Sequence, residues 1–377
     1  MSDLPAHSPL GASSAERWMA CPGSTTLINA LREGDPEFDT DDPDYRRDGV
    51  QAHALAAECL NAGIDAWEAP VENYPDLTAE MMAAVQVHLD YVRSLDGQRF
   101  VEYKLHRPGF HEAMYGTVDA AVQGQRKGLH VIDYKHGVGV VVEVENNPQI
   151  MYYAFMLIDE LGDFDDDEEV TLTIVQPRVT WHPDGGVRSW VSTVGHIRRW
   201  AGETLRPAME RTAVEGYLAT GEHCRFCPAK LICSGFLQRA NRALKLGDIK
   251  ALTDDLLAEL LHDVPLLKMA LTALTAEAKK RTINEAKVLP GWKLVNAMAD
   301  RIWKDTAPVA DKFGFQPQKI KSPAQVEAEP GGKEFVAEWA FRPNAGYDLV
   351  PETDRRKAVV LEKSSETFKQ AIESLKQ

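Results

Sequence analysis

The sequence lacks a long apolar run, an internal repeat of useful length and a low-complexity segment. Because no stretch approaches the roughly 18 apolar residues of a membrane-spanning helix, no membrane span is indicated. The N-terminus also lacks the basic and then apolar residues of a secretory signal. We therefore expect a cytoplasmic protein that does not enter a membrane.

Basic residues are in the minority, with 42 Lys and Arg against 57 Asp and Glu and a net charge of −15 at pH 7. Non-specific adhesion to nucleic acid depends on Lys and Arg, so this balance argues against broad coating of DNA. A local basic groove is still compatible with it. Part of the acidic excess lies in residues 163–169, which we interpret as a solvated loop before a strand.

Length and composition are those of a globular protein. The 377 residues allow one large domain with extensions, or two domains, at roughly 150 residues per domain. With 44% hydrophobic and 26% charged residues, the chain can form a sizeable core. The sequence changes character near residue 245, so we expect one domain over residues 1–240 and a C-terminal extension over residues 245–377.

The strongest signal for chemistry lies in residues 116–153. Asp133 and Lys135 project from the same face of a predicted strand, because side chains alternate with period two. Asp119 lies in the preceding predicted strand, and residues 124–128 resemble a hairpin connection, so pairing would place Asp119 beside Asp133. Two close carboxylates repel each other, and a Mg or Mn ion relieves that repulsion. Lys135 would orient the attacking water or stabilise charge on a phosphate.

Three other residues are candidates for the same site only because of residues 116–153. His53 falls in the first turn of a predicted helix over residues 50–62, where a lone histidine is more often structural than a ligand. Gln149 and Tyr153, four residues apart in a helix that opens with a proline, share one face and also fit a polar helix surface with a packed tyrosine. Glu102, in a predicted strand over residues 100–106, fits no pattern. It is either a further site carboxylate or a solvent-facing residue.

The cysteines form a second constellation. Cys224, Cys227 and Cys233 follow the spacing C-x2-C-x5-C, and in a cytoplasmic protein such clustering favours a metal over disulfides. A metal–thiolate site usually takes four ligands, and Cys21 is the candidate for the fourth. The spacing alone fits iron–sulfur and zinc equally well, and zinc also allows His223 as a ligand.

The position of Cys21 is predicted from its neighbours. Ser13 or Ser14 would cap a short helix that Pro22 ends just after Cys21. Cys59, inside the predicted helix of His53, is more simply a buried thiol.

The rest of the chain offers weaker signals. The predicted helix over residues 194–216 carries Arg198, Arg199 and Arg206 as candidate contacts to a DNA backbone. A long helix is predicted over residues 249–286, short strands over 291–295 and 301–304, a helix over 306–313 and a charged helical tail over 354–377. Trp292 and Trp303 are expected to pack in a core, with stacking on bases as the alternative.

In its order of motifs the chain resembles the PD-(D/E)xK nuclease superfamily. Within it, the RecB-like branch includes the iron–sulfur nucleases of the AddAB recombination complex and of CRISPR adaptation. The branch combines a helix histidine, a G-x-x-D strand, a D-x-K strand and a Q-x3-Y helix. In this chain the four elements correspond to His53, Asp119, Asp133 with Lys135, and Gln149 with Tyr153. The resemblance covers residues 13–240. One cysteine before the core and C-x2-C-x5-C after it resemble the iron–sulfur staple of those enzymes, which favours a 4Fe-4S cluster over zinc.

The resemblance implies an α/β, restriction-endonuclease-like core with a mixed central sheet flanked by helices, followed by a helical and small-strand extension. In this interpretation His53, Asp119 and Asp133 bind Mg or Mn, Lys135 positions water, and Gln149 and Tyr153 contact DNA or orient Lys135. The four cysteines Cys21, Cys224, Cys227 and Cys233 would hold the cluster.

The implied activity is that of a metal-dependent DNA exonuclease. It would serve phage recombination or DNA processing in a bacterial cell, with a strand-annealing or single-strand-binding protein as a possible partner. No G-x4-G-K-[ST] helicase signature occurs, so we expect a stand-alone protein. The alternative is a DNA-binding or recombination scaffold that keeps the fold but does not hydrolyse DNA.

Overall fold

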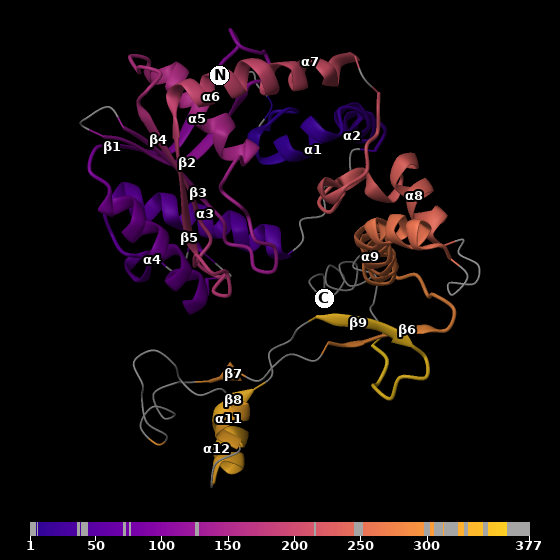
Figure 1. Cartoon of the computed structure of the whole chain (residues 1–377). Helices are drawn as coiled ribbons and strands as arrows, with labels where there is room; N and C mark the ends of the chain where they lie inside the picture. Colours follow the sequence, from indigo (N-terminus) through magenta and orange to yellow (C-terminus); the bar gives the residue numbers. More distant parts are fainter. Residues whose placement is uncertain are drawn as a thin grey trace, which may run out of the picture. The chain divides into compact units, whose positions relative to one another are not determined.

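A computed structural model of the chain (Figure 1) describes residues 5, 7–35, 38, 44–70, 73–74, 77–124, 128–214, 216–244, 252–297, 302–304, 312, 323–327, 331–341 and 346–359. The chain divides into two compact units, Met1–Leu267 and Lys268–Gln377. Within the described ranges, no helix combines the length and the apolar composition of a membrane-spanning segment.

The first unit is built on a five-stranded mixed sheet in the order β1-β2-β3-β4-β5. Its strands are β1 (Gln98–His106), β2 (Tyr115–Gln123), β3 (Leu129–Tyr134), β4 (Glu169–Val175) and β5 (Val187–Thr193). β3 and β4 are parallel, and the other neighbours are antiparallel. The helix α5 (Pro148–Leu161) supplies the crossover that parallel neighbours require. The expected α/β class with a mixed central sheet is confirmed.

Helices cover both faces of this sheet (Figure 1). One face packs against α1 (Ala15–Ala20), α5, α6 (Val194–Trp200) and α7 (Arg206–Val214), with the π-helical turn η4 (Ala201–Leu205) between the last two. The other face packs against α3 (Asp44–Ala62), α4 (Ala79–Ser94) and the short η2 (Ala66–Glu68). The strand β3 is therefore apolar on both faces, with Leu129 and Val131 in one core and Ile132 and Tyr134 in the other.

The other described helices of this unit are η1 (Ala12–Ser14), which packs against α5, and, in or beside the cysteine-rich segment, α2 (Gly23–Gly34), η5 (Glu222–Cys224), η6 (Pro228–Leu231) and α8 (Ser234–Leu244). The helix α9 (Asp254–Ile283) begins in this unit and ends in the second. Pro265 lies inside α9.

The register of β2 and β3 is the feature that positions the site. Ala120 pairs with Ile132 in this antiparallel pair, so Asp119 comes opposite Asp133, as predicted. The backbone N–H of Lys135 donates to the carbonyl of Val175 (2.8 Å), which continues the β3–β4 ladder one residue beyond β3.

Three local predictions were wrong. The helix of His53 begins at Asp44, so His53 lies well inside it and not in its first turn. Ser14 precedes α1, but its hydroxyl donates to the carbonyl of Gly11 and does not cap the helix. Residues 354–359 are turns and irregular backbone, because Asp354 accepts the N–H of Arg356 in a local turn.

The second unit contains two small two-stranded sheets. β6 (Trp292–Asn296) pairs with β9 (Tyr347–Pro351), and β7 (Ile302–Trp303) pairs with β8 (Ala340–Phe341). The helices α11 (Pro323–Glu327) and α12 (Gly332–Trp339) also lie here. Trp292 is exposed, against the core-packing interpretation. The helix predicted over residues 306–313 and the tail after residue 359 lie outside the described residues, apart from residue 312.

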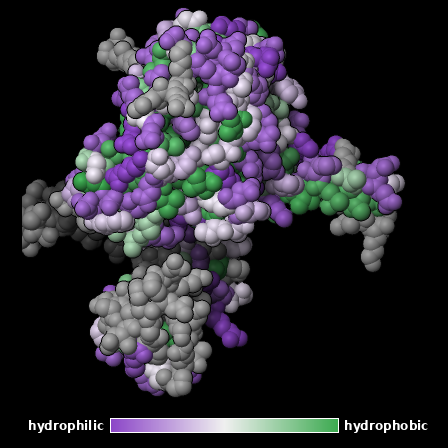
Figure 2. Space-filling model, turned by 60° about the vertical axis from the view of Figure 1, so that its left-hand side comes forward, coloured by the Kyte–Doolittle hydropathy of each residue, from purple (hydrophilic) through white to green (hydrophobic). Residues whose placement is uncertain are grey.

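Hydrophilic and hydrophobic residues are interspersed over the face shown in Figure 2.

Arg198 and Arg199 lie on α6 and are exposed, and the guanidinium of Arg198 pairs with Asp166 (2.6 Å). Arg206 donates to the carbonyl of Phe110 (2.9 Å) and lies over its ring. Of these three predicted DNA contacts, Arg206 has a packing role within the unit.

Candidate functional site

Three elements bring the predicted catalytic residues together at the end of β3. The ammonium of Lys135 donates to Oδ1 of Asp133 (3.1 Å) and lies 2.9 Å from its Oδ2. Gln149, from α5, accepts from Lys135 through Oε1 (3.0 Å) and donates from Nε2 to Oδ1 of Asp133 (2.7 Å). A carboxylate, an ammonium and an amide thus form one closed hydrogen-bonded triangle.

Gln149 owes its place to the start of α5. The side chain of Asn147 caps this helix by accepting the N–H groups of Gln149 (2.9 Å) and Ile150 (3.4 Å). Pro148 occupies the first turn, where its missing N–H costs nothing. The sequence Asn-Pro-Gln therefore fixes where the helix begins and which way its first polar side chain points.

Asp119 joins the site from β2. Its Oδ2 accepts the backbone N–H of Tyr134 (2.9 Å), and its Oδ1 lies 3.4 Å from Nδ1 of His53. The imidazole of His53, from α3, also packs edge-on against the ring of Tyr134, with 5.4 Å between the ring centroids. The structure therefore brings His53, Asp119, Asp133, Lys135 and Gln149 to one place.

Tyr153 lies one turn along α5 from Gln149 and is buried. Burial, reinforced by the charges of Asp119 and Asp133, raises the pKa of its phenol well above the ordinary value. Its ring explains Gly116 of the G-x-x-D motif, because a Cβ on Gly116 would lie 3.3 Å from a ring carbon of Tyr153.

Glu102 is a site residue that the sequence patterns did not assign. It lies in β1 between two residues that pair with Ala120 and Val118, and therefore opposite Asp119. Ligand atoms of His53, Glu102 and Asp119 all lie within 4.8 Å of one another. The φ angle of Glu102 is +45°, in the left-handed region that non-glycine residues avoid. The available signal was a carboxylate in the strand predicted to precede that of Asp119.

The electrostatics of the site follow from burial and mutual contact. Burial alone would raise the pKa of Asp119, but His53 and Lys135 hold it below its ordinary value. Burial is the main cause that raises the pKa values of Asp133 and Glu102, and the charge of Asp119 raises both further. The charge of Lys135 lowers the pKa of Asp133, but it does not cancel this rise. Burial would lower the pKa values of His53 and Lys135, but the neighbouring carboxylates raise both.

The side chains of His53, Glu102, Asp119 and Asp133 fit a divalent cation. They offer carboxylate oxygens and one imidazole nitrogen, a donor set suited to Mg or Mn. Oδ2 of Asp133 is buried and, among the described residues, accepts no well-formed hydrogen bond, although the ammonium of Lys135 lies near it. A buried carboxylate oxygen without a well-formed hydrogen bond lowers the stability of the fold unless a ligand binds it.

The four predicted cysteine ligands line one small cavity. Cys21, at the end of α1, faces Cys224, Cys227 and Cys233 from the segment after α7, and all four thiols are free and buried. Burial raises the pKa values of Cys224 and Cys227. Cys59 packs elsewhere, in the core beneath α3 and α4.

The cavity also contains a histidine. His223 lines it, and a hydrogen bond to Cys21 contributes to a raised pKa of its imidazole. The set of donors therefore fits a thiolate-bound iron–sulfur cluster or zinc, with His223 within reach as an alternative ligand.

Two comparisons with known proteins complete the description. A family model described as a protein of unknown function (DUF2800) matches residues 7–357. A solved structure titled "Crystal structure of SSO0001" is 11% identical to this chain and covers 55% of this chain and 94% of its own, with a TM-score of 0.24. That structural similarity is too weak to support an inference about fold or function.

Proposed function

The chain belongs to the DUF2800 family of proteins of unknown function, and we propose that it is a metal-dependent deoxyribonuclease with a restriction-endonuclease-like core. Its reaction is the hydrolysis of phosphodiester bonds, with exonucleolytic attack at DNA ends preferred. The preference for ends, and a role in phage recombination or DNA processing beside a strand-annealing or single-strand-binding protein, rest on the sequence resemblance.

The triangle formed by Asp133, Lys135 and Gln149 is the observation that supports this proposal most directly. Gln149 from α5 meets Asp133 and Lys135 at the carboxyl end of β3, and Asp133 is only 2% exposed. Burying the carboxylate of Asp133 is costly unless it is paired and hydrogen-bonded. Such an arrangement is therefore typical of a functional site, where perturbed pKa values accumulate.

The residues divide the chemistry between them. Asp119, Asp133, His53 and Glu102 would hold the cation, which supplies a water of lowered pKa and neutralises charge on the phosphate. The ammonium of Lys135, hydrogen-bonded to Asp133, would donate hydrogen bonds to the attacking water or to the phosphate. Gln149 holds the Lys135 ammonium in place. Tyr153 forms the wall beside them.

We expect the purified protein to degrade end-labelled single- or double-stranded DNA in Mn or Mg. Asp133→Asn and Lys135→Ala should each slow degradation by about 100-fold or more, since they remove a ligand and the charge that stabilises the phosphate. Asp159→Asn is the matched control, because Asp159 forms a surface ion pair with Arg107 and should leave the rate unchanged.

Comparing 5′ and 3′ labels in the same assay reveals the polarity of attack. The proposed nuclease activity would be refuted if wild-type protein bound DNA but left it intact with every divalent ion tested. That result would support the alternative of a non-hydrolysing DNA-binding or recombination scaffold.

A further inference from the structure

Ser24 carries a buried hydroxyl group beside the cysteines. The residue is 3% exposed, and its Oγ has no hydrogen-bond partner among the described residues. It lines the cavity that contains Cys21, Cys224, Cys227 and Cys233. A buried hydroxyl without a hydrogen bond lowers the stability of the fold unless a ligand accepts one from it. The hydroxyl of Ser24 therefore points to a ligand in this cavity.

The backbone around Ser24 fixes its position. Its N–H donates to the carbonyl of Cys21 (3.0 Å), and the N–H of Gly23 donates to the carbonyl of Tyr217 (2.9 Å). A Cβ on Gly23 would lie 2.6 Å from the carbonyl oxygen of Gly216, so glycine lets the start of α2 approach this segment closely. Ser24 is thus held between Cys21 and the segment that precedes the other three cysteines.

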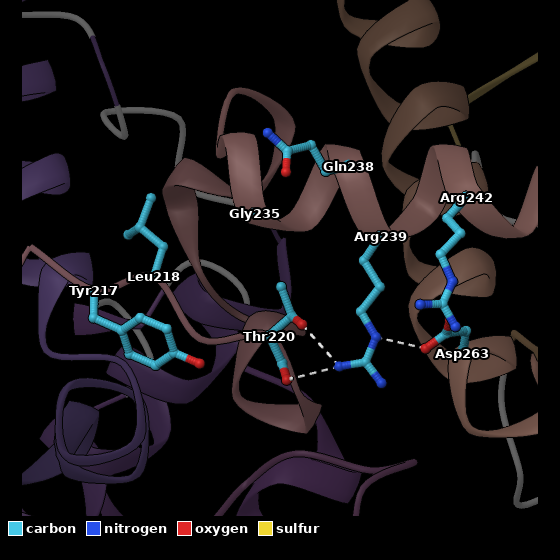
Figure 3. A pocket seen from close by; sticks show the side chains of 8 residues that line it. All are labelled: Tyr217, Leu218, Thr220, Gly235, Gln238, Arg239, Arg242 and Asp263. Atoms are coloured by element: carbon cyan, nitrogen blue, oxygen red, sulfur yellow. Dashed lines mark hydrogen bonds and ion pairs between the residues drawn. The ribbon is translucent and has the colours of Figure 1, made fainter. Parts of the chain in front are cut away.

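That segment is also anchored to α8 (Figure 3). Nη1 of Arg239 donates to the hydroxyl (2.9 Å) and the carbonyl (3.4 Å) of Thr220, and its Nε donates to Oδ1 of the buried Asp263. Thr220 precedes η5, the short helix that ends at Cys224. The segment is therefore fixed on one side by Gly23 and on the other by Arg239.

Positive side chains also line the cysteine cavity. They are Arg17 and Lys230. Burial raises the pKa values of the Cys224 and Cys227 thiols, and the charges of Lys230 and Arg17, respectively, oppose that rise. Thiolates that bind a metal or an iron–sulfur cluster carry negative charge, which cations and a hydroxyl donor stabilise.

From these contacts we propose that the hydroxyl of Ser24 donates a hydrogen bond to a sulfur atom of the metal group bound by the four cysteines. The sulfur atoms become more electron-rich when an iron–sulfur cluster takes up an electron, so this bond is stronger in the reduced state. Hydrogen bonds to the sulfurs help to set the reduction potential of such clusters. Ser24 therefore raises the potential of the cluster. This inference rests on a thiolate-bound metal group in the cavity and not on cleavage of DNA.

The test is a redox titration of full-length protein purified without oxygen. Dithionite supplies electrons, ferricyanide takes them up again, and absorbance and electron paramagnetic resonance report the state of the cluster. Ser24→Ala should keep its iron and labile sulfide. The ratio of reduced to oxidised cluster at a fixed potential should fall by about 2- to 10-fold, as loss of one hydrogen bond predicts. For one electron, tenfold corresponds to a shift of about 59 mV to lower potential.

Thr25→Val is the matched control. Thr25 follows Ser24 on α2, and its hydroxyl oxygen is also buried and without a hydrogen-bond partner among the described residues, but it does not line the cavity. Its variant should keep the wild-type potential. A second pair, Ser24→Thr and Ser24→Val, compares side chains of nearly equal shape with and without the hydroxyl. Ser24→Thr should keep the wild-type potential and metal content, and Ser24→Val should not.

Zinc in place of the cluster would leave the hydrogen bond measurable. After exchange of zinc for Co(II), loss of the bond in Ser24→Ala should move the sulfur-to-cobalt charge-transfer band to lower energy. The reason is that a thiolate without the hydrogen bond gives up an electron more easily.

Three results would overturn the inference: a wild-type protein that binds no metal at the cysteines, an unchanged potential or charge-transfer energy in metal-loaded Ser24→Ala, or an equal change in Thr25→Val. If Ser24→Ala does not retain the metal, equal behaviour of Ser24→Thr and Ser24→Val overturns it. An effect of Ser24 in a protein that does not degrade DNA refutes the nuclease alone. Degradation of DNA with a wild-type potential in Ser24→Ala refutes only this inference.

Discussion

His88 shows how one buried residue ties stability to pH. It lies on α4 beneath the site, with its ring 5.0 Å from that of Tyr134, and its Nδ1 has no hydrogen-bond partner among the described residues. Burial, and to a lesser extent the charge of His53, lowers the pKa of His88 to about 4 from 6.5. The folded protein therefore keeps this imidazole neutral where the unfolded chain would protonate it.

We predict a loss of stability in acid that belongs to His88. As pH falls through 6.5, the unfolded chain takes up a proton on His88, which the folded protein accepts only near pH 4. The free energy of unfolding should therefore fall by about 2 kcal/mol between pH 7 and pH 5. Urea unfolding of wild type and His88→Gln across this range measures it, and the difference between the two stabilities should change by that amount. Parallel curves would contradict the prediction.

At the scale of residues, part of the site was predictable from local rules. The period of two along a strand placed Asp133 and Lys135 on one face, and the spacing of four placed Gln149 and Tyr153 on one side of a helix. Glu102 was not predictable, because its participation depends on strand register and on a positive φ angle that no local pattern encodes.

Among the elements, α5 controls the geometry of the triangle. Its cap, Asn147, fixes the first turn that carries Gln149. The loop before it is held by Gln176, whose amide donates to the carbonyls of Gly137 (3.1 Å) and Val140 (2.8 Å). The buried Arg188 supports Gln176 through its Oε1 (2.9 Å). A polar network thus holds both ends of the segment that follows Lys135.

Replacing the cap should affect stability and activity separately. Asn147→Ala should cost about 1 kcal/mol of unfolding free energy and lower the proposed nuclease rate about tenfold or more, because Gln149 loses its fixed position. Thr78→Ala removes the equivalent cap of α4, where Thr78 accepts the N–H of Met81 (3.0 Å). It should cost similar stability and leave the rate unchanged.

Chemical denaturation and the end-labelled digestion measure the two effects. Equal rate losses in both variants would show that the activity responds to general stability and not to α5.

The prediction of elements succeeded where the sequence carried a strong period. The central strands and α5 were found within a few residues, and β2–β3 paired as expected. The start of α3 was misplaced, since the residues before position 50 are charged and carry no apolar period to signal a helix. The long helix predicted over residues 249–286 corresponds to α9, on which Leu261, Leu271 and Leu274 are exposed and Leu260 and Leu266 are buried.

For the first unit as a whole, the cysteine cavity joins the beginning of the chain to the segment after α7. The Sγ of Cys21 lies 4.0 Å from the carbonyl oxygen of Tyr217, and Leu218 lines this cavity. A metal or cluster bound there would close a loop around the whole sheet, and such closure stabilises the folded state.

Cys21→Ser and Cys224→Ser should each abolish the bound iron and sulfide and lower the melting temperature of the protein purified without oxygen. Cys59→Ser, which alters a buried thiol outside the cavity, should keep the metal content. Iron, zinc and labile sulfide per chain are the measurements. One zinc per chain without iron would contradict the proposed 4Fe-4S cluster and leave the nuclease proposal intact.

The backbone of Glu102 has a consequence for the history of this protein. A left-handed conformation in a strand is strained for glutamate and comfortable for glycine. Glycine would adopt this conformation with less strain, so the glutamate is consistent with a role for its carboxylate at the proposed cation site. If the proposed DNA cleavage is the activity of this protein, a lineage that had lost it would be free to carry glycine at residue 102.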